Sequence, residues 1–147
     1  MDRKEYDQLA EELKPTGHKV KNGFNAFLYG GVMGVIAQAI LEFFMNVYHC
    51  SQKEATPMMT ITLVFFACLL TGLGIYDNIA KHAGAGTFIP ITGFANSMSS
   101  SAMDSRSEGL IFGIGSNMFK LGGTVITYGI VSSSLLGVIR YVITLFW

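Results

Sequence analysis

The chain has 147 residues, of which half are hydrophobic and 14% charged, and its acidic and basic side chains are equal in number. Its mean hydropathy of +0.43 means more apolar surface than one soluble domain of this size can easily enclose. These values indicate an integral membrane protein of one domain. They exclude nucleic acid as a partner, because the lysines and arginines form no extended basic patch.

The first 22 residues hold ten charges of both signs and no apolar core, so they are not a secretory signal peptide. Apolar side chains recur there at helical spacing: Tyr6, Leu9, Ala10 and Leu13. This pattern predicts a short amphipathic helix, which either rests on the membrane surface or docks a cytosolic partner. We therefore divide the chain into a cytoplasmic amphipathic segment, residues 1–22, and a membrane domain, residues 23–147.

Two transmembrane helices are predicted next. Residues 24–48 carry one charge, Glu42, and at ~1.5 Å per residue they exceed the ~30 Å hydrocarbon thickness. Thr56 can cap a second helix and Pro57 suits its first position, which opens an uncharged run to Tyr76. Together the two helices predict an antiparallel hairpin.

Basic residues predict how this hairpin is oriented. Five lysines and arginines precede the first span, whereas the connection at residues 49–56 carries only Lys53. Because cytoplasmic loops carry the excess of lysine and arginine, we expect the N-terminus in the cytoplasm.

Residues 84–109 contain too many helix-disfavouring residues for one continuous transmembrane helix. Their first half also carries too few charges for a loop in water. Helix-disfavouring residues gather in their first half: Gly84, Gly86, Pro90 and Gly93. Residues 109–119 are apolar but cover only ~16 Å as a helix. Two half-elements that meet at residues 104–108 predict a re-entrant hairpin. Irregular backbone at membrane depth must be buried in protein or line a water-filled cavity, so we expect a pore or a subunit contact here.

Residues 121–139 are uncharged and can continue as a helix to Trp147, which predicts a third full span. The expected fold class is therefore an all-α integral membrane protein with three full transmembrane helices and a broken re-entrant hairpin. The alternative has four crossings, with residues 109–139 as one long helix broken at Gly122 and Gly123.

The first and last spans carry stripes of small and polar residues. Gly30 and Gly34 form a G-x-x-x-G pair, which predicts close helix packing. Gln38 and Glu42 continue that stripe, and an ionisable group inside a span is costly unless it faces protein or water. We expect these two to face a pore, with an interfacial position for Glu42 as the alternative. The last span has a second predicted packing face: Gly129, Ser133 and Gly137.

Further hydrogen-bonding and charged groups fall in the broken region. Together with Gln38 and Glu42 they are the predicted pore-lining or solute-lining residues: Thr92, Asn96, Ser97, Asp104, Arg106, Glu108, Asn117 and Lys120. The N-termini of half-helices there would suit a carboxylate, because they present partial positive charge and free N–H groups. The alternative is a self-contained network in which Arg106 pairs with an acidic neighbour and the serines cap helix ends.

The sequence predicts neither catalysis nor a bound metal or cofactor. It contains no Ser-His-Asp order and no phosphate-cradling loop, so we expect no enzyme activity. His18, His49 and His82 lack the spacing of metal ligands. Cys50 and Cys68 are expected at different membrane depths, and we predict two free thiols.

Several motifs also match a known family. The chain contains LLTGLGIYDNIAKHAGAGTFIPITGFANSMSSSAMDSRSEG, followed by GIGSNMFKLGG. With TGFANS, SEG and MFKL in this order, it resembles the SpoVAC/SpoVAE membrane proteins of endospore-forming bacteria, from about residue 19 to the end. The charged N-terminal extension, with Asn117 and Lys120 in SNMFK, is more similar to the AC branch than to the AE paralogue.

The resemblance implies a subunit of the SpoVA channel complex in the inner membrane of the forespore and spore. It implies movement of dipicolinic acid, together with calcium, in sporulation and germination. The implied partners are the AE-type membrane paralogue and a soluble cytosolic SpoVA subunit, in a hetero-oligomer within the lipid bilayer. The alternatives are a mechanosensitive channel subunit and a non-conducting membrane scaffold for a cytosolic partner.

Overall fold

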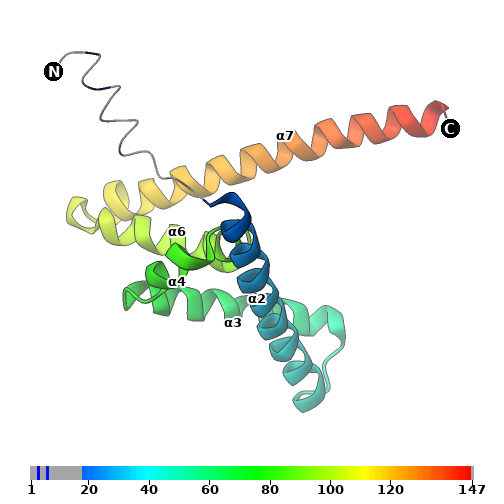
Figure 1. Cartoon of the computed structure of the whole chain (residues 1–147), viewed down its shortest axis with the longest axis horizontal. Coiled ribbons are helices and arrows are strands. Elements are labelled where there is room, and N and C mark those ends of the chain that lie inside the picture. Colours follow the sequence, from blue (N-terminus) through cyan, green and yellow to red (C-terminus); the bar gives the residue numbers. More distant parts are fainter. Residues whose placement is uncertain (1–2, 4–5, 7–17, 147) are drawn as a thin grey trace.

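The computed structural model describes Arg3, Tyr6 and residues 18–146, and every regular element in this part of the chain is helical. Three helices are long and apolar enough to cross a membrane, which confirms the predicted all-α membrane class (Figure 1). Except for Tyr6, the predicted amphipathic helix near the N-terminus lies outside the described residues.

The first two long helices, α2 (Lys19–Val47) and α3 (Gln52–Gly72), contact each other and are joined by a short connection. The predicted start of α3 at Thr56 and Pro57 is wrong. Ser51 caps the helix instead, because its N–H and its hydroxyl both donate to Glu54 Oε2, at 3.0 and 2.8 Å. A Ser-x-x-Glu capping box therefore starts the helix one turn earlier, and the Thr56 hydroxyl donates within it to Gln52 O at 2.7 Å.

After α3 the chain folds into three shorter helices. They are α4 (Tyr76–Ala83), α5 (Ala85–Phe88) and α6 (Ile91–Asp104). Gly84 separates the first two with a φ of +52°, a conformation that favours glycine. The 14 residues of α6 span only about 21 Å, so this helix is shorter than the hydrocarbon layer is thick. The structure thus shows the predicted interruptions near Gly84 and Pro90.

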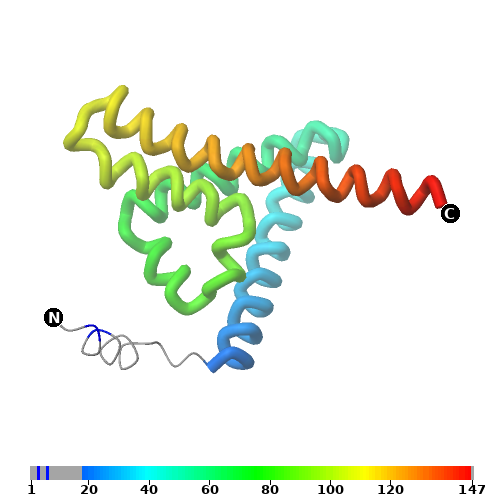
Figure 2. The backbone as a smooth tube through the Cα atoms, turned by 90° about the horizontal axis from the view of Figure 1, so that it is seen from above, coloured from blue at the N-terminus to red at the C-terminus, as the bar shows by residue number. Residues whose placement is uncertain are grey.

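The chain reverses direction at residues 105–109. A 3₁₀ turn at Arg106–Glu108 and Gly109, whose φ is +92°, connect α6 to a π-helical turn at Leu110–Gly115. The chain then returns alongside α6 (Figure 2), which makes a helical hairpin at the predicted place.

The second arm of this hairpin does not end near residue 119 as expected. The π-helical turn continues directly into α7 (Ser116–Phe146). The turn and α7 together form an apolar helical run of 37 residues, Leu110–Phe146. This resembles the long helix of the alternative topology, except that α7 passes through Gly122 and Gly123 unbroken. No proline or positive φ interrupts the run, so glycine alone does not break it.

The core lies where α6 packs against α3 and α4. Ala67, Tyr76 and Ala95 form its buried cluster. The Tyr76 hydroxyl donates to Thr87 O at 3.0 Å, and Thr87 is itself 2% exposed. Small side chains on α3 and α6 let the helices approach closely, and the tyrosine ties α5 to α4.

Gly86 places the short helix α5 directly against the backbone of α2. A Cβ atom on Gly86 would collide with Ala26 O and would lie 2.8 Å from Gly30 N. A Cβ on Gly30 would in turn lie 3.6 Å from the Gly86 Cα. The contact between α2 and α5 therefore depends on the missing side chain of Gly86.

Gly86→Ala is expected to lower the free energy of unfolding by about 1–3 kcal/mol, because two backbone atoms of α2 must move. The matched control is Gly123→Ala, where a Cβ meets nothing within 4 Å. That change should be neutral or stabilise by up to about 1 kcal/mol. Denaturation of the detergent-solubilised protein, followed by circular dichroism, measures both; equal stability of the two variants would contradict the described contact.

Candidate functional site

The predicted solute-lining residues fall on α2, α6, the hairpin turn and the start of α7, and the structure gives them different roles. Asn96 joins two helices. The Thr71 hydroxyl on α3 donates to Asn96 Oδ1 on α6 at 2.8 Å and lies 2.6 Å from Ala67 O. Thr71 is 3% exposed, so this polar contact lies inside the protein. Sequence reasoning missed Thr71, because no local pattern shows which residue of α3 faces Asn96.

Asn117 fastens the hairpin turn to α7. Its Nδ2 donates to Ser105 Oγ at 2.6 Å and to Gly113 O at 3.3 Å. Ser105 is buried at the end of α6, and it was not among the predicted residues. The Asn117 side chain therefore holds the turn closed, and its donors are already engaged.

A hollow of about 300 Å³ lies between α6 and α7. It is lined by Ser101, Asn117, Lys120, Leu121 and Thr124. Lys120 is the one charged side chain of this lining, and it forms no ion pair with any residue that the structure describes. The hollow thus offers the Lys120 ammonium group and the Ser101 hydroxyl to a small acidic solute.

The charged residues of the turn are exposed and separate. Asp104, Arg106 and Glu108 all face outward, and no ion pair joins them among the described residues. The self-paired arrangement considered from the sequence is therefore absent from this part of the chain. The Ser97 hydroxyl forms its hydrogen bond within its own helix, where it donates to Gly93 O at 3.0 Å.

On α2 the two predicted pore residues contact each other. Gln38 Nε2 donates to Glu42 Oε1 at 3.0 Å on an exposed face of the helix. That these two side chains face a pore stays a prediction.

Thr92 occupies an unusual position at the start of α6. It is 2% exposed, and its hydroxyl has no hydrogen-bond partner among the described residues. Thr92 lines an open, mostly apolar groove of about 290 Å³ together with Gly30, Gly34 and Pro90. A buried hydroxyl without a partner is unfavourable for stability.

The second packing face lies on the part of α7 that extends away from the other helices (Figure 1). A Cβ on Gly129 or Gly137 would meet nothing within 4 Å, and the Ser133 hydroxyl donates to Ile130 O of its own helix. No residue of α7 is buried within the single chain. Contact of this face with another helix stays a prediction.

The described residues hold no group of three histidine, cysteine, aspartate or glutamate side chains that could bind a metal ion. Cys50 and Cys68 are both free thiols.

Comparison with known proteins identifies relatives across almost the whole chain. The model of the SpoVAC/SpoVAEB sporulation membrane protein family matches residues 22–139. Stage V sporulation protein AC of Bacillus subtilis (strain 168) is 41% identical over 139 residues, which cover 95% of this chain and 93% of the relative. No solved structure matches the chain significantly.

The contact between Thr71 and Asn96 can be tested by a double-mutant cycle. Thr71→Val and Asn96→Ala should be coupled by about 0.5–2 kcal/mol in the free energy of unfolding, because each removes the same hydrogen bond between helices. As a control, Thr71→Val and Ser97→Ala should be additive, since Ser97 donates within its own helix. Additivity of the first pair, measured by denaturation in detergent, would contradict the hydrogen bond.

Proposed function

Because the chain belongs to the SpoVAC/SpoVAEB family of sporulation membrane proteins, we propose that it is a membrane subunit of the SpoVA channel complex. In this proposal the complex moves dipicolinic acid, with calcium, across the spore inner membrane. Uptake takes place in sporulation and release in germination. The N-terminus faces the cytoplasm, where residues 1–22 can meet a soluble SpoVA subunit.

The hollow around Lys120 is the observation that carries this proposal. Dipicolinate is a small planar dianion, and an ammonium group attracts a carboxylate without requiring a fixed geometry. The adjacent Ser101 hydroxyl adds a neutral hydrogen-bond donor, whereas the Thr124 hydroxyl already donates to Leu121 O at 2.7 Å. Such a site favours entry of the anion without trapping it, which passage through a channel requires.

Two features support assembly with other membrane subunits. The second half of α7 extends away from the other helices, and an open, mostly apolar groove lies beside Gly30, Gly34 and Thr92. We propose that the AE-type paralogue covers these surfaces. Interhelical hydrogen bonds and close packing of small residues are the interactions that join helices in lipid.

Lys120→Gln tests the role of the hollow in spores. Loss of a hydrogen bond to a charged group should weaken solute binding by about 1.5–3 kcal/mol, or tenfold or more, so dipicolinate accumulation should slow. Arg140→Gln, another exposed cation on α7, is the matched control and should leave accumulation normal. Dipicolinate is assayed in spores with equal subunit levels; normal accumulation in Lys120→Gln would contradict the assignment.

Reconstitution separates the conduit from its alternatives. A conduit should pass dipicolinate when the membrane subunits are placed in vesicles, even after deletion of residues 1–14. A scaffold should pass none and should lose its cytosolic partner on that deletion. A mechanosensitive channel should pass solute only when the vesicle membrane is stretched.

A further inference from the structure

Basic side chains from two separate elements lie at the end of the molecule where α2 begins. Lys19 and Lys21 lie in the first turn of α2, which contains no acidic residue. The last turn of α4 carries Lys81 and His82. Positive side chains at the start of a helix oppose its dipole, so their presence in α2 needs another reason than helix stability.

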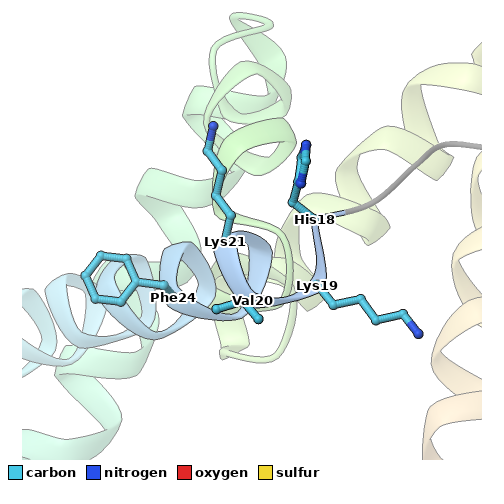
Figure 3. Close-up of a pocket in the computed structure, with 5 residues that line it drawn as sticks. All are labelled: His18, Lys19, Val20, Lys21 and Phe24. Atoms are coloured by element: carbon cyan, nitrogen blue, oxygen red, sulfur yellow. The ribbon is translucent and has the colours of Figure 1, made fainter.

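A hollow of about 350 Å³ lies between these two elements. Its lining includes Asn22 of α2 and Lys81 and His82 of α4. Lys21, one residue before Asn22, extends to the same side as His18, while Lys19 points away (Figure 3). The nearest acidic residue of α4 is Asp77, and the described residues form no ion pair here.

We infer from the topology that this hollow lies at the membrane surface. The helices α2 and α3 contact each other and are joined by a short connection, so the start of α2 and the end of α3 lie on the same side. The helix α4 follows α3 after three residues and contacts α2. Tyr76 and Ala83 of α4 are buried, whereas Asp77, Lys81 and His82 are exposed, as in a helix at a polar interface.

An apolar groove continues from the hollow along α2. This groove, of about 340 Å³, shares Ala26 and Ala85 with the hollow and extends past Gly30 and Gly31 to Pro90. It therefore runs from near the start of α2 toward the middle of the helix, in the direction of the hydrocarbon. A polar, basic hollow that opens into an apolar groove matches the two parts of a phospholipid.

We propose that this site binds an anionic phospholipid, with the headgroup phosphate in the hollow and an acyl chain in the groove. The Lys81 ammonium group in the lining attracts the phosphate, and the Asn22 amide can donate a hydrogen bond to it. Lys21 does not line the hollow, but it lies next to Asn22 on α2 and adds positive charge beside it. The groove decides between a lipid and a free phosphate ion, because a free ion would leave this apolar surface uncovered. Neither part of the site belongs to the Lys120 hollow.

The headgroup part of the site is tested in vesicles of equal parts phosphatidylglycerol and phosphatidylcholine. Spin-labelled lipids report the association constant of phosphatidylglycerol with the full chain relative to that of phosphatidylcholine. Removal of one lysine, by Lys21→Gln or Lys81→Gln, should reduce the preference for phosphatidylglycerol about fivefold, equivalent to about 1 kcal/mol. Lys53→Gln, at the opposite end of the α2–α3 hairpin, should leave it unchanged. Unchanged preference in both site variants would overturn the proposal.

The groove is tested separately by Gly31→Leu, because Gly31 lines the groove and a Cβ there meets no atom within 4 Å. This change should weaken the association of phosphatidylglycerol severalfold, and the matched change Gly123→Leu on α7 should not. Lys81→Arg should retain the preference, which separates loss of charge from loss of fold. Displacement of the lipid by millimolar inorganic phosphate at constant ionic strength would assign the hollow to a free anion and overturn the lipid assignment.

Discussion

Backbone that leaves a regular helix inside a membrane needs hydrogen-bond partners from the protein or from water, because lipid offers none. This chain interrupts its α-helices at several points between residues 84 and 115, and nearby side chains supply partners there. The Tyr76 hydroxyl donates a hydrogen bond to Thr87 O, and the Asn117 side-chain amide donates one to Gly113 O. The tight contact of Gly86 with α2 holds α5, which directly follows the first of these interruptions, against the protein. The architecture depends on these contacts.

The same constraint divides the polar side chains into two groups. Asn96, Ser97 and Asn117 are engaged by the protein itself, so their first role is to hold helices and turns together. Lys120 and Thr92 have no such partner among the described residues. Lys120 is exposed and therefore available to a solute, whereas the Thr92 hydroxyl is buried, and for this reason our functional proposal rests on Lys120.

The two basic hollows differ in what adjoins them. Lys120 stands among hydroxyls and an amide between α6 and α7, an arrangement suited to a compact, fully polar anion. The hollow at Asn22 and Lys81 opens into an apolar groove and suits an anion with a hydrocarbon tail. Charge alone does not distinguish these ligands, whereas the surface next to each charge does.

The sequence by itself determined the helical class, the three apolar spans, the interruptions near Gly84 and Pro90, a turn at about residues 104–108 and the family. These features follow from hydropathy, helix-breaking residues and motif order, all of which are local along the chain. Only the tertiary structure decided that Ser51 starts α3, that α7 continues through Gly122 and Gly123, and that Thr71 meets Asn96. It also decided that α2 and α4 bring Asn22 and Lys81 to one hollow. Such pairs depend on how helices rotate and pack against one another, and no periodicity in a single helix records that choice.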